Sequence, residues 1–196
     1  IGLDMLFGRR NALVSLVIVL GVLGAGAGFL YYSGGLAEAH VISLPLSISS
    51  PVMPSSVDVT ISLRDTNLTL GSLPGESKQL ASGTLEYYDR QGEPIHTLKI
   101  GDPNAELRLD EQNQHDFSFS NFANTAHQWD VRLNRVVPFT LLVNTGDANS
   151  TLDLTNLHLT RIDFHGGDGN LTLTVPQGAG EVTGQLDLGD GNINLV

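Results

Sequence analysis

Apolar and polar residues alternate along most of the chain after residue 57, and between residues 140 and 196 the alternation repeats. Three stretches there align without gaps, and each has Gly-Asp-x-Asn between two alternating segments. The glycines of these turns stand 21 and 22 residues apart, and the apolar positions beyond each turn keep the same phase. Alternation with a period of two predicts β-strands with one buried face. Gly-Asp-x-Asn predicts turns, in which Gly supplies a positive φ and Asp or Asn binds nearby amides.

A fourth, degenerate copy of the repeat lies upstream at residues 61–70, with Arg64 at the glycine position. The turn residues of the four copies are Asp65 and Asn67; Gly146, Asp147 and Asn149; Gly167, Asp168 and Asn170; Gly189, Asp190 and Asn192. A strand–turn–strand unit cannot bury its inner face alone and must stack on its neighbours. The sequence therefore predicts a mostly β protein in which residues 57–196 form a β-solenoid-like coil of about 21–22-residue repeats.

Stacking in register predicts which side chains share a row. The residues expected to point inward and stack are Leu152, Leu173 and Leu195, together with Val143, Phe164 and Leu186. The same register places Asn149, Asn170 and Asn192 above one another, where amide side chains can form a hydrogen-bonded ladder. The alternative is a run of ordinary antiparallel hairpins with similar turns, and the matched phase on both sides of each turn favours the coil. A calcium roll is disfavoured, because Leu171 occupies a ligand position and the period is more than twice the roughly nine residues of that repeat.

The N-terminal part contains a long apolar segment. Residues 12–32 carry no charge, and their 21 residues suffice to cross about 30 Å of hydrocarbon as a helix. Arg9 and Arg10 precede the segment, and Tyr31 and Tyr32 end it. The positive-inside rule then predicts a cytoplasmic flank at 1–10, a single-pass transmembrane helix at 11–32 and an extracytoplasmic remainder. The competing interpretation is a cleaved signal peptide, since residues 37–39 resemble a signal-peptidase site, although the apolar core is long for one.

Small residues crowd one half of this predicted helix. Gly24 and Gly28 are four residues apart, and this spacing lets a second helix approach closely within a membrane. They are the predicted helix-packing residues, with other membrane protein subunits as the partners. The alternative is that small residues merely fill the membrane span.

Residues 33–56 are rich in Ser, Gly and Pro and predict a linker, although residues 41–48 alternate enough to form an edge strand. Further on, residues 83–88 and 95–100 alternate on either side of residues 89–94 and predict a hairpin. The β-domain is therefore expected to span residues 57–196.

Composition and motifs give no indication of catalysis. A net charge of −11 disfavours non-specific nucleic-acid binding, and the absence of cysteine excludes disulfides and thiolate sites within this chain. The histidines have no metal-ligand spacing, and there is no nucleophile elbow, phosphate loop or dinucleotide fingerprint. We therefore predict no catalytic, cofactor-binding or metal-binding residues, no cofactor and no small-molecule substrate.

Several ordered motifs resemble a known family. They are Leu80-Ala-Ser-Gly-Thr-Leu-Glu-Tyr87, Trp129-x-x-Arg-Leu-Asn134-x-x-Val-Pro138, Leu141-Leu-Val-Asn-Thr-Gly146, Leu152-Asp-Leu-Thr-Asn-Leu157, Phe164-His-Gly-Gly-Asp-Gly169 and Val175-Pro-Gln-Gly178. Together they resemble the toast-rack domain of LiaF-like bacterial membrane proteins, which act in the cell-envelope stress and cell-wall-active antibiotic response. The resemblance implies a β-coil on a membrane anchor that works by protein contact, with no catalytic residues to carry over.

Two functions follow from these observations. The first is a non-catalytic, membrane-anchored binding or scaffold protein with an extracytoplasmic β-domain, held in a larger assembly in the cell membrane. The alternative is an envelope-stress sensor or regulator that acts on a signalling partner. In both, the expected partners are the lipid bilayer and other membrane protein subunits.

Overall fold

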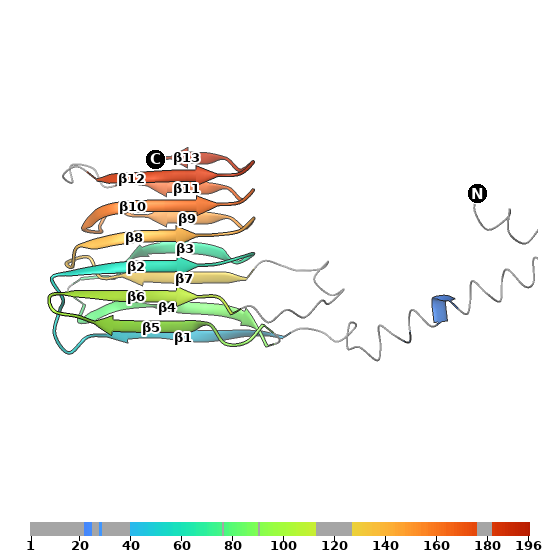
Figure 1. The fold of residues 1–196 in the computed structure, drawn as a ribbon, viewed down its shortest axis with the longest axis horizontal. Helices are drawn as coiled ribbons and strands as arrows, with labels where there is room; N and C mark the ends of the chain where they lie inside the picture. Colours follow the sequence, from blue (N-terminus) through green and yellow to red (C-terminus); the bar gives the residue numbers. More distant parts are fainter. Residues whose placement is uncertain are drawn as a thin grey trace, which may run out of the picture. The chain divides into compact units, whose positions relative to one another are not determined.

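The computed structural model describes residues 22–24, 28, 40–75, 77–89, 91–112, 127–175 and 182–196. From residue 40 onward, the described chain forms two facing β-sheets whose strands stack one above another (Figure 1). The order in the seven-stranded sheet is β1 (Val41–Ser49), β4 (Gln79–Tyr88), β7 (Gln128–Leu133), β3 (Asn67–Ser72), β9 (Ser150–Asp153), β11 (Leu171–Thr174) and β13 (Ile193–Leu195). The order in the six-stranded sheet is β12 (Thr183–Leu188), β10 (Leu159–Gly166), β8 (Phe139–Asn144), β2 (Ser56–Ser62), β6 (Asn104–Asp110) and β5 (Ile95–Ile100).

The C-terminal repeats stack in register, as their apolar pattern predicts. Strands β8, β10 and β12 run parallel and align Val143, Phe164 and Leu186 in one row. Strands β9, β11 and β13 run parallel in the other sheet and align Leu152, Leu173 and Leu195. Both predicted rows are confirmed, although Leu195, at the end of its row, is not buried. Its side chain is 62% exposed, because β13 is the last strand of its sheet.

Each strand–turn–strand unit forms one rung of the stack, and the rungs do not follow chain order. Strands β2 and β3, which carry the degenerate copy, lie between β8 and β9 on one side and β6 and β7 on the other. Ile61 pairs with Val143, and Leu70 pairs with Leu152, so the early copy extends both apolar rows. Alternation determines which side chains face inward, but it does not determine which rung lies next to which.

Side chains from both sheets fill the space between the two layers. Trp129, Phe139 and Phe164 are among the largest fully buried residues. Leucine, isoleucine and valine side chains from the inner faces complete one continuous core. The indole Nε1 of Trp129 donates a hydrogen bond to the backbone oxygen of Glu86 at 3.0 Å, so this buried polar group is satisfied.

Antiparallel strands complete the end of the stack where β1 and β5 lie (Figure 1). Strand β1 pairs with β4, and β5 pairs with β6. The predicted hairpin of residues 83–88 and 95–100 is therefore wrong, since β4 and β5 belong to different sheets. Residues 89–94 are long enough to cross between sheets that pack about 10 Å apart. Strand β5 turns back onto β6 instead, where the Gly101 amide donates to the Asn104 oxygen at 2.8 Å.

Part of the predicted linker belongs to the β-domain. Residues 41–49 form β1, and its Leu46 and Ile48 are buried in the core. The edge-strand alternative is therefore correct for this segment, and the domain begins before residue 57. Pro45 lies within β1, where its missing amide hydrogen is tolerated because β1 has a strand on one side only.

The predicted transmembrane helix at 11–32 lies largely outside the described residues, and the predicted flank at 1–10 lies entirely outside them. Residues 22–24 and 28 are helical. Within the part of the chain that the structure describes, no helix has the length and apolar character required to cross a membrane.

We expect Leu173→Asp to unfold the β-domain, because Leu173 is buried between the sheets and an unpaired buried carboxylate costs at least several kcal/mol. Thr172→Asp is the matched control, since Thr172 lies on the same strand and points to the outer face. Thermal unfolding followed by circular dichroism measures the difference. Equal melting temperatures for the two variants would contradict the assignment of the inner face.

Candidate binding sites on the stacked turns and in an apolar hollow

The asparagines of the four turns form a continuous hydrogen-bonded ladder. The amide of Asn149 donates to Oδ1 of Asn67 at 2.9 Å. The amide and Nδ2 of Asn170 both donate to Oδ1 of Asn149, each at 3.1 Å. Asn192 repeats the arrangement on Oδ1 of Asn170, at 3.3 Å from its amide and 3.0 Å from its Nδ2. The predicted ladder is thus present, and it extends to the degenerate copy.

The aspartates of the same turns form a second ladder beside the first. Oδ1 of Asp147 accepts the amide of Asp168 at 3.1 Å, and Oδ1 of Asp168 accepts the amide of Asp190 at 3.0 Å. These carboxylates therefore satisfy backbone donors of the next rung. Among the described residues, no group of three or more His, Asp or Glu side chains is placed to hold a metal ion.

The turn glycines are required for close packing between rungs. The glycines with positive φ in the described chain are Gly75, Gly83 and Gly92, so the predicted positive φ at Gly146, Gly167 and Gly189 is wrong. A Cβ on Gly167 would lie 2.3 Å from Oδ1 of Asp147, and one on Gly189 would lie 2.6 Å from Oδ1 of Asp168. Each glycine leaves room for the aspartate side chain of the previous rung.

Glu111 supplies the equivalent acceptor below the degenerate copy. Its Oε2 accepts the amide of Arg64 at 2.8 Å, and its Oε1 accepts the hydroxyl of Thr66 at 3.0 Å. Asp65 lies exposed in this turn. Glu111 is not predicted by the sequence pattern, because it follows β6 directly and carries no part of the repeat motif.

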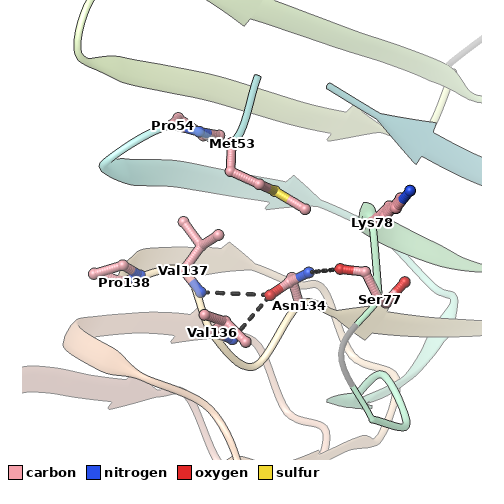
Figure 2. Close-up of a pocket in the computed structure, with 8 residues that line it drawn as sticks. All are labelled: Met53, Pro54, Ser77, Lys78, Asn134, Val136, Val137 and Pro138. Atoms are coloured by element: carbon pink, nitrogen blue, oxygen red, sulfur yellow. Dashed lines mark hydrogen bonds between the residues drawn. The ribbon is translucent and has the colours of Figure 1, made fainter. Parts of the chain in front are cut away.

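An apolar hollow lies beside the loops that precede β2, β4 and β8 (Figure 2). Its volume is about 520 Å³. The residues that line it are Met53, Pro54, Ser77, Lys78, Asn134, Val136, Val137 and Pro138. Figure 2 shows the Met53 side chain reaching across the hollow from one side, opposite Val137 and Asn134. The sequence pattern does not predict this hollow, because its lining residues come from three loops that are far apart in the chain.

Asn134 organises the wall of the hollow and is almost fully buried. Its Nδ2 donates to the backbone oxygens of Ser77 and Gln79, each at 2.8 Å. Its Oδ1 accepts the amides of Val136 at 2.8 Å and Val137 at 3.4 Å. Every hydrogen-bonding position of this side chain is therefore occupied within the protein. Asn134 belongs to one of the family-like motifs, which is the sequence signal that singles it out.

His127 is a buried titratable group at the start of β7. Neither ring nitrogen has a hydrogen-bond partner among the described residues, and the ring packs edge-on against Tyr88, with the centroids 3.6 Å apart. Burial lowers the pKa of His127 from its ordinary value of 6.5, and the nearby Glu86 carboxylate partly offsets this by raising the pKa. The folded state therefore favours the neutral imidazole.

The predicted helix-packing residues Gly24 and Gly28 are within the described residues. A Cβ added at either position would meet no atom within 4 Å. Their proposed contact with a second helix remains a prediction.

Two facing sheets with laddered turns define a repeat-containing β-domain, and the family comparison agrees. The model of the N-terminal domain of toast_rack, DUF2154, matches residues 51–196, so the chain belongs to the toast-rack family. The resemblance noted in the sequence is thereby confirmed at the level of this domain. No curated protein matches the chain in sequence.

Two solved bacterial structures were matched to the chain. A “putative cell adhesion protein” from Clostridium sporogenes superposes with a TM-score of 0.64 at 14% identity, covering 80% of this chain and 99% of its own. A “putative adhesin” from Bacteroides fragilis matches with a TM-score of 0.27 at 7% identity, covering 80% of this chain and 97% of its own. The first supports the fold, and the second is too distant to carry an argument.

We expect Asn170→Ala to lower the free energy of unfolding by about 1–2 kcal/mol, because it removes the side-chain bonds to both adjacent rungs at an exposed site. Asn156→Ala is the control, since Asn156 makes a single 3.4 Å side-chain bond to its neighbour Thr155. Urea unfolding of both variants measures the difference. A loss confined to Asn156→Ala would show that the ladder does not stabilise the stack.

We expect the stability of the domain to fall as the pH is lowered, partly through His127. The lowered folded-state pKa means that the unfolded chain binds more protons, so the contribution of His127 is complete above about pH 6.5 and is lost as the pH falls through the folded-state value. His127→Phe should flatten the pH dependence, and His158→Gln, at an exposed position, should not. Melting temperatures from about pH 8 to about pH 5 test this. Identical pH profiles for wild type and His127→Phe would disprove it.

Proposed function

We propose that this protein is a non-catalytic binding or scaffold protein whose β-solenoid-like domain lies outside a cell membrane as part of a larger assembly. The observation that carries the proposal is the regularity of the domain. Laddered turns hold both sheets in fixed register from one rung to the next. Repeat folds use extended, regular surfaces of this kind for recognition.

Two further observations support a role in binding. The fold relative from Clostridium sporogenes bears a name that refers to cell adhesion, which is recognition rather than catalysis. The chain has a net charge of −11, so the domain surface favours a basic or cation-rich partner over an anionic membrane surface.

The membrane anchor is the part of the proposal that rests on sequence. The uncharged segment at 12–32 follows Arg9 and Arg10, which favours a cytoplasmic N-terminus and an extracytoplasmic β-domain. Gly24 and Gly28 on the proposed transmembrane helix would allow a neighbouring subunit to approach closely. Such packing matters most in lipid, where no hydrophobic effect drives helices together.

A second candidate is an envelope-stress sensor or regulator of the LiaF-like kind. Membership of the toast-rack family favours it, because the LiaF-like proteins noted above contain this domain. In that role the domain would change the activity of a signalling partner. Deletion of the gene would then alter transcription of envelope-stress genes, whereas loss of a scaffold would alter the composition of a membrane complex.

We expect the double variant Gly24→Leu/Gly28→Leu to lose its protein partners, because two leucines on this helix face would block close helix approach. Membrane insertion and the β-domain should be unaffected. Gly26→Leu is the control, since residue 26 projects from roughly the opposite face of a helix. Affinity purification of the full chain in mild detergent, followed by mass spectrometry, measures partner recovery. Unchanged recovery with the double variant would place any association in the β-domain and leave the helix as a plain anchor.

A further inference from the structure

One unpaired cationic residue lines the apolar hollow, and a second is next to the lining residues in sequence. Lys78 lines it, and Arg135 lies in the same loop between the lining residues Asn134 and Val136. Of the other five described lysines and arginines, Lys99, Arg108, Arg132 and Arg161 are ion-paired, and Arg64, in the turn of the degenerate copy, is not. Within the described part of the protein, Lys78 and Arg135 have no such pair. An acidic protein thus keeps one uncompensated positive charge in the lining of its apolar hollow, and a second in a loop that contributes to that lining.

The hollow itself offers few hydrogen bonds to a ligand. The side chain of Asn134 and the amides of Val136 and Val137 are engaged with one another. Pro54 and Pro138 have no amide hydrogen, and the hydroxyl oxygen of Ser77 already accepts the amide of Gln79 at 3.1 Å. A polar ligand would lose its hydrogen bonds to water on entering, which is costly. The part of a ligand that enters must therefore be apolar.

Apolar side chains also remain exposed around the hollow. Val136 is 61% exposed and Met53 is 41% exposed, and both line the space. Val52, next to Met53, is 74% exposed. Burial of these side chains against an aliphatic chain would remove apolar surface from water, and the volume lies within the range of ligand pockets.

We propose that the hollow binds the aliphatic chain of a single-chain amphiphile whose anionic head, a carboxylate or a phosphate, lies at Lys78 and Arg135. A peptide fits less well, because its backbone would need hydrogen bonds that this lining does not provide. A bilayer surface fits less well, because the acidic domain would be repelled by anionic lipids while only two cations attract. This site is independent of the proposed scaffold role, which concerns protein partners.

Photolabelling tests the proposal on the full chain in nanodiscs of phosphatidylcholine. The probe is a medium-chain fatty acid with a diazirine on its chain, and the matched uncharged probe is the corresponding fatty alcohol. Peptide mass spectrometry should locate the label of the acid at Met53, Val136 or Val137. Lys78→Gln/Arg135→Gln should reduce this labelling by roughly five- to tenfold, whereas Lys99→Gln, which removes a paired surface cation, should not. Val136→Asp, at an exposed position, should also abolish it without unfolding the domain.

Three outcomes would overturn the proposal. One is equal labelling of the hollow by the acid and the alcohol, which would remove the role of charge. Another is equal labelling of wild type and the double cation variant. The third is loss of the label when an acidic peptide with an apolar end is added, which would make a protein segment the better occupant. Recovery of protein partners by the full chain is measured separately, so either proposal can fail while the other stands.

Discussion

The fold depends on backbone amides in each turn finding acceptors on the adjacent rung. In a stack of parallel strands the ladder supplies these acceptors within the sheets, and backbone bonds such as that from the Gly167 amide to the Gly146 oxygen continue it only in part through the turns. Aspartate and asparagine side chains supply the other acceptors: Oδ1 of Asn67, Asp147, Asn149, Asp168 and Asn170 each accepts the amide of the equivalent residue one rung on. The rungs can approach closely enough only because glycine precedes each aspartate in the three C-terminal turns, where a Cβ would collide with the rung before it.

This constraint determines much of the remaining architecture. Turns held in register keep the strands on both sides in register, so the inner side chains form rows across each sheet. Those rows build one continuous core between the sheets. Where the repeat motif is absent, other side chains make hydrogen bonds to the backbone. Glu111 accepts the amide of Arg64. Asn134, in the loop before β8, donates to the backbone oxygens of Ser77 and Gln79 at the start of β4. Asn134 also forms part of the wall of the apolar hollow.

The sequence predicts the inner face and the register well, because both follow from alternation and from turns of nearly constant spacing. It predicts the order of rungs poorly. The degenerate copy at 61–70 stacks directly on β8 and β9, although β4 to β7 intervene in the chain. Local pattern contains no information on such long-range neighbours, and for the same reason the segment around residues 83–100 suggests a hairpin that does not form. The sequence does not predict the hollow either, because its lining residues come from three loops that share no motif.

The distribution of charge connects architecture with function. The chain is strongly acidic, and four of its described cations are paired with carboxylates nearby, so most of the positive charge is neutralised where it occurs. The outer faces therefore present a mainly negative field. Arg64, Lys78 and Arg135 are the described cations without such a pair, and Lys78 lines the hollow at which apolar side chains are also exposed. Exposed apolar patches with polar residues at their rim commonly mark binding sites. At this hollow an unpaired cation and exposed apolar side chains therefore occur together, which is the combination that the proposed amphiphile site requires.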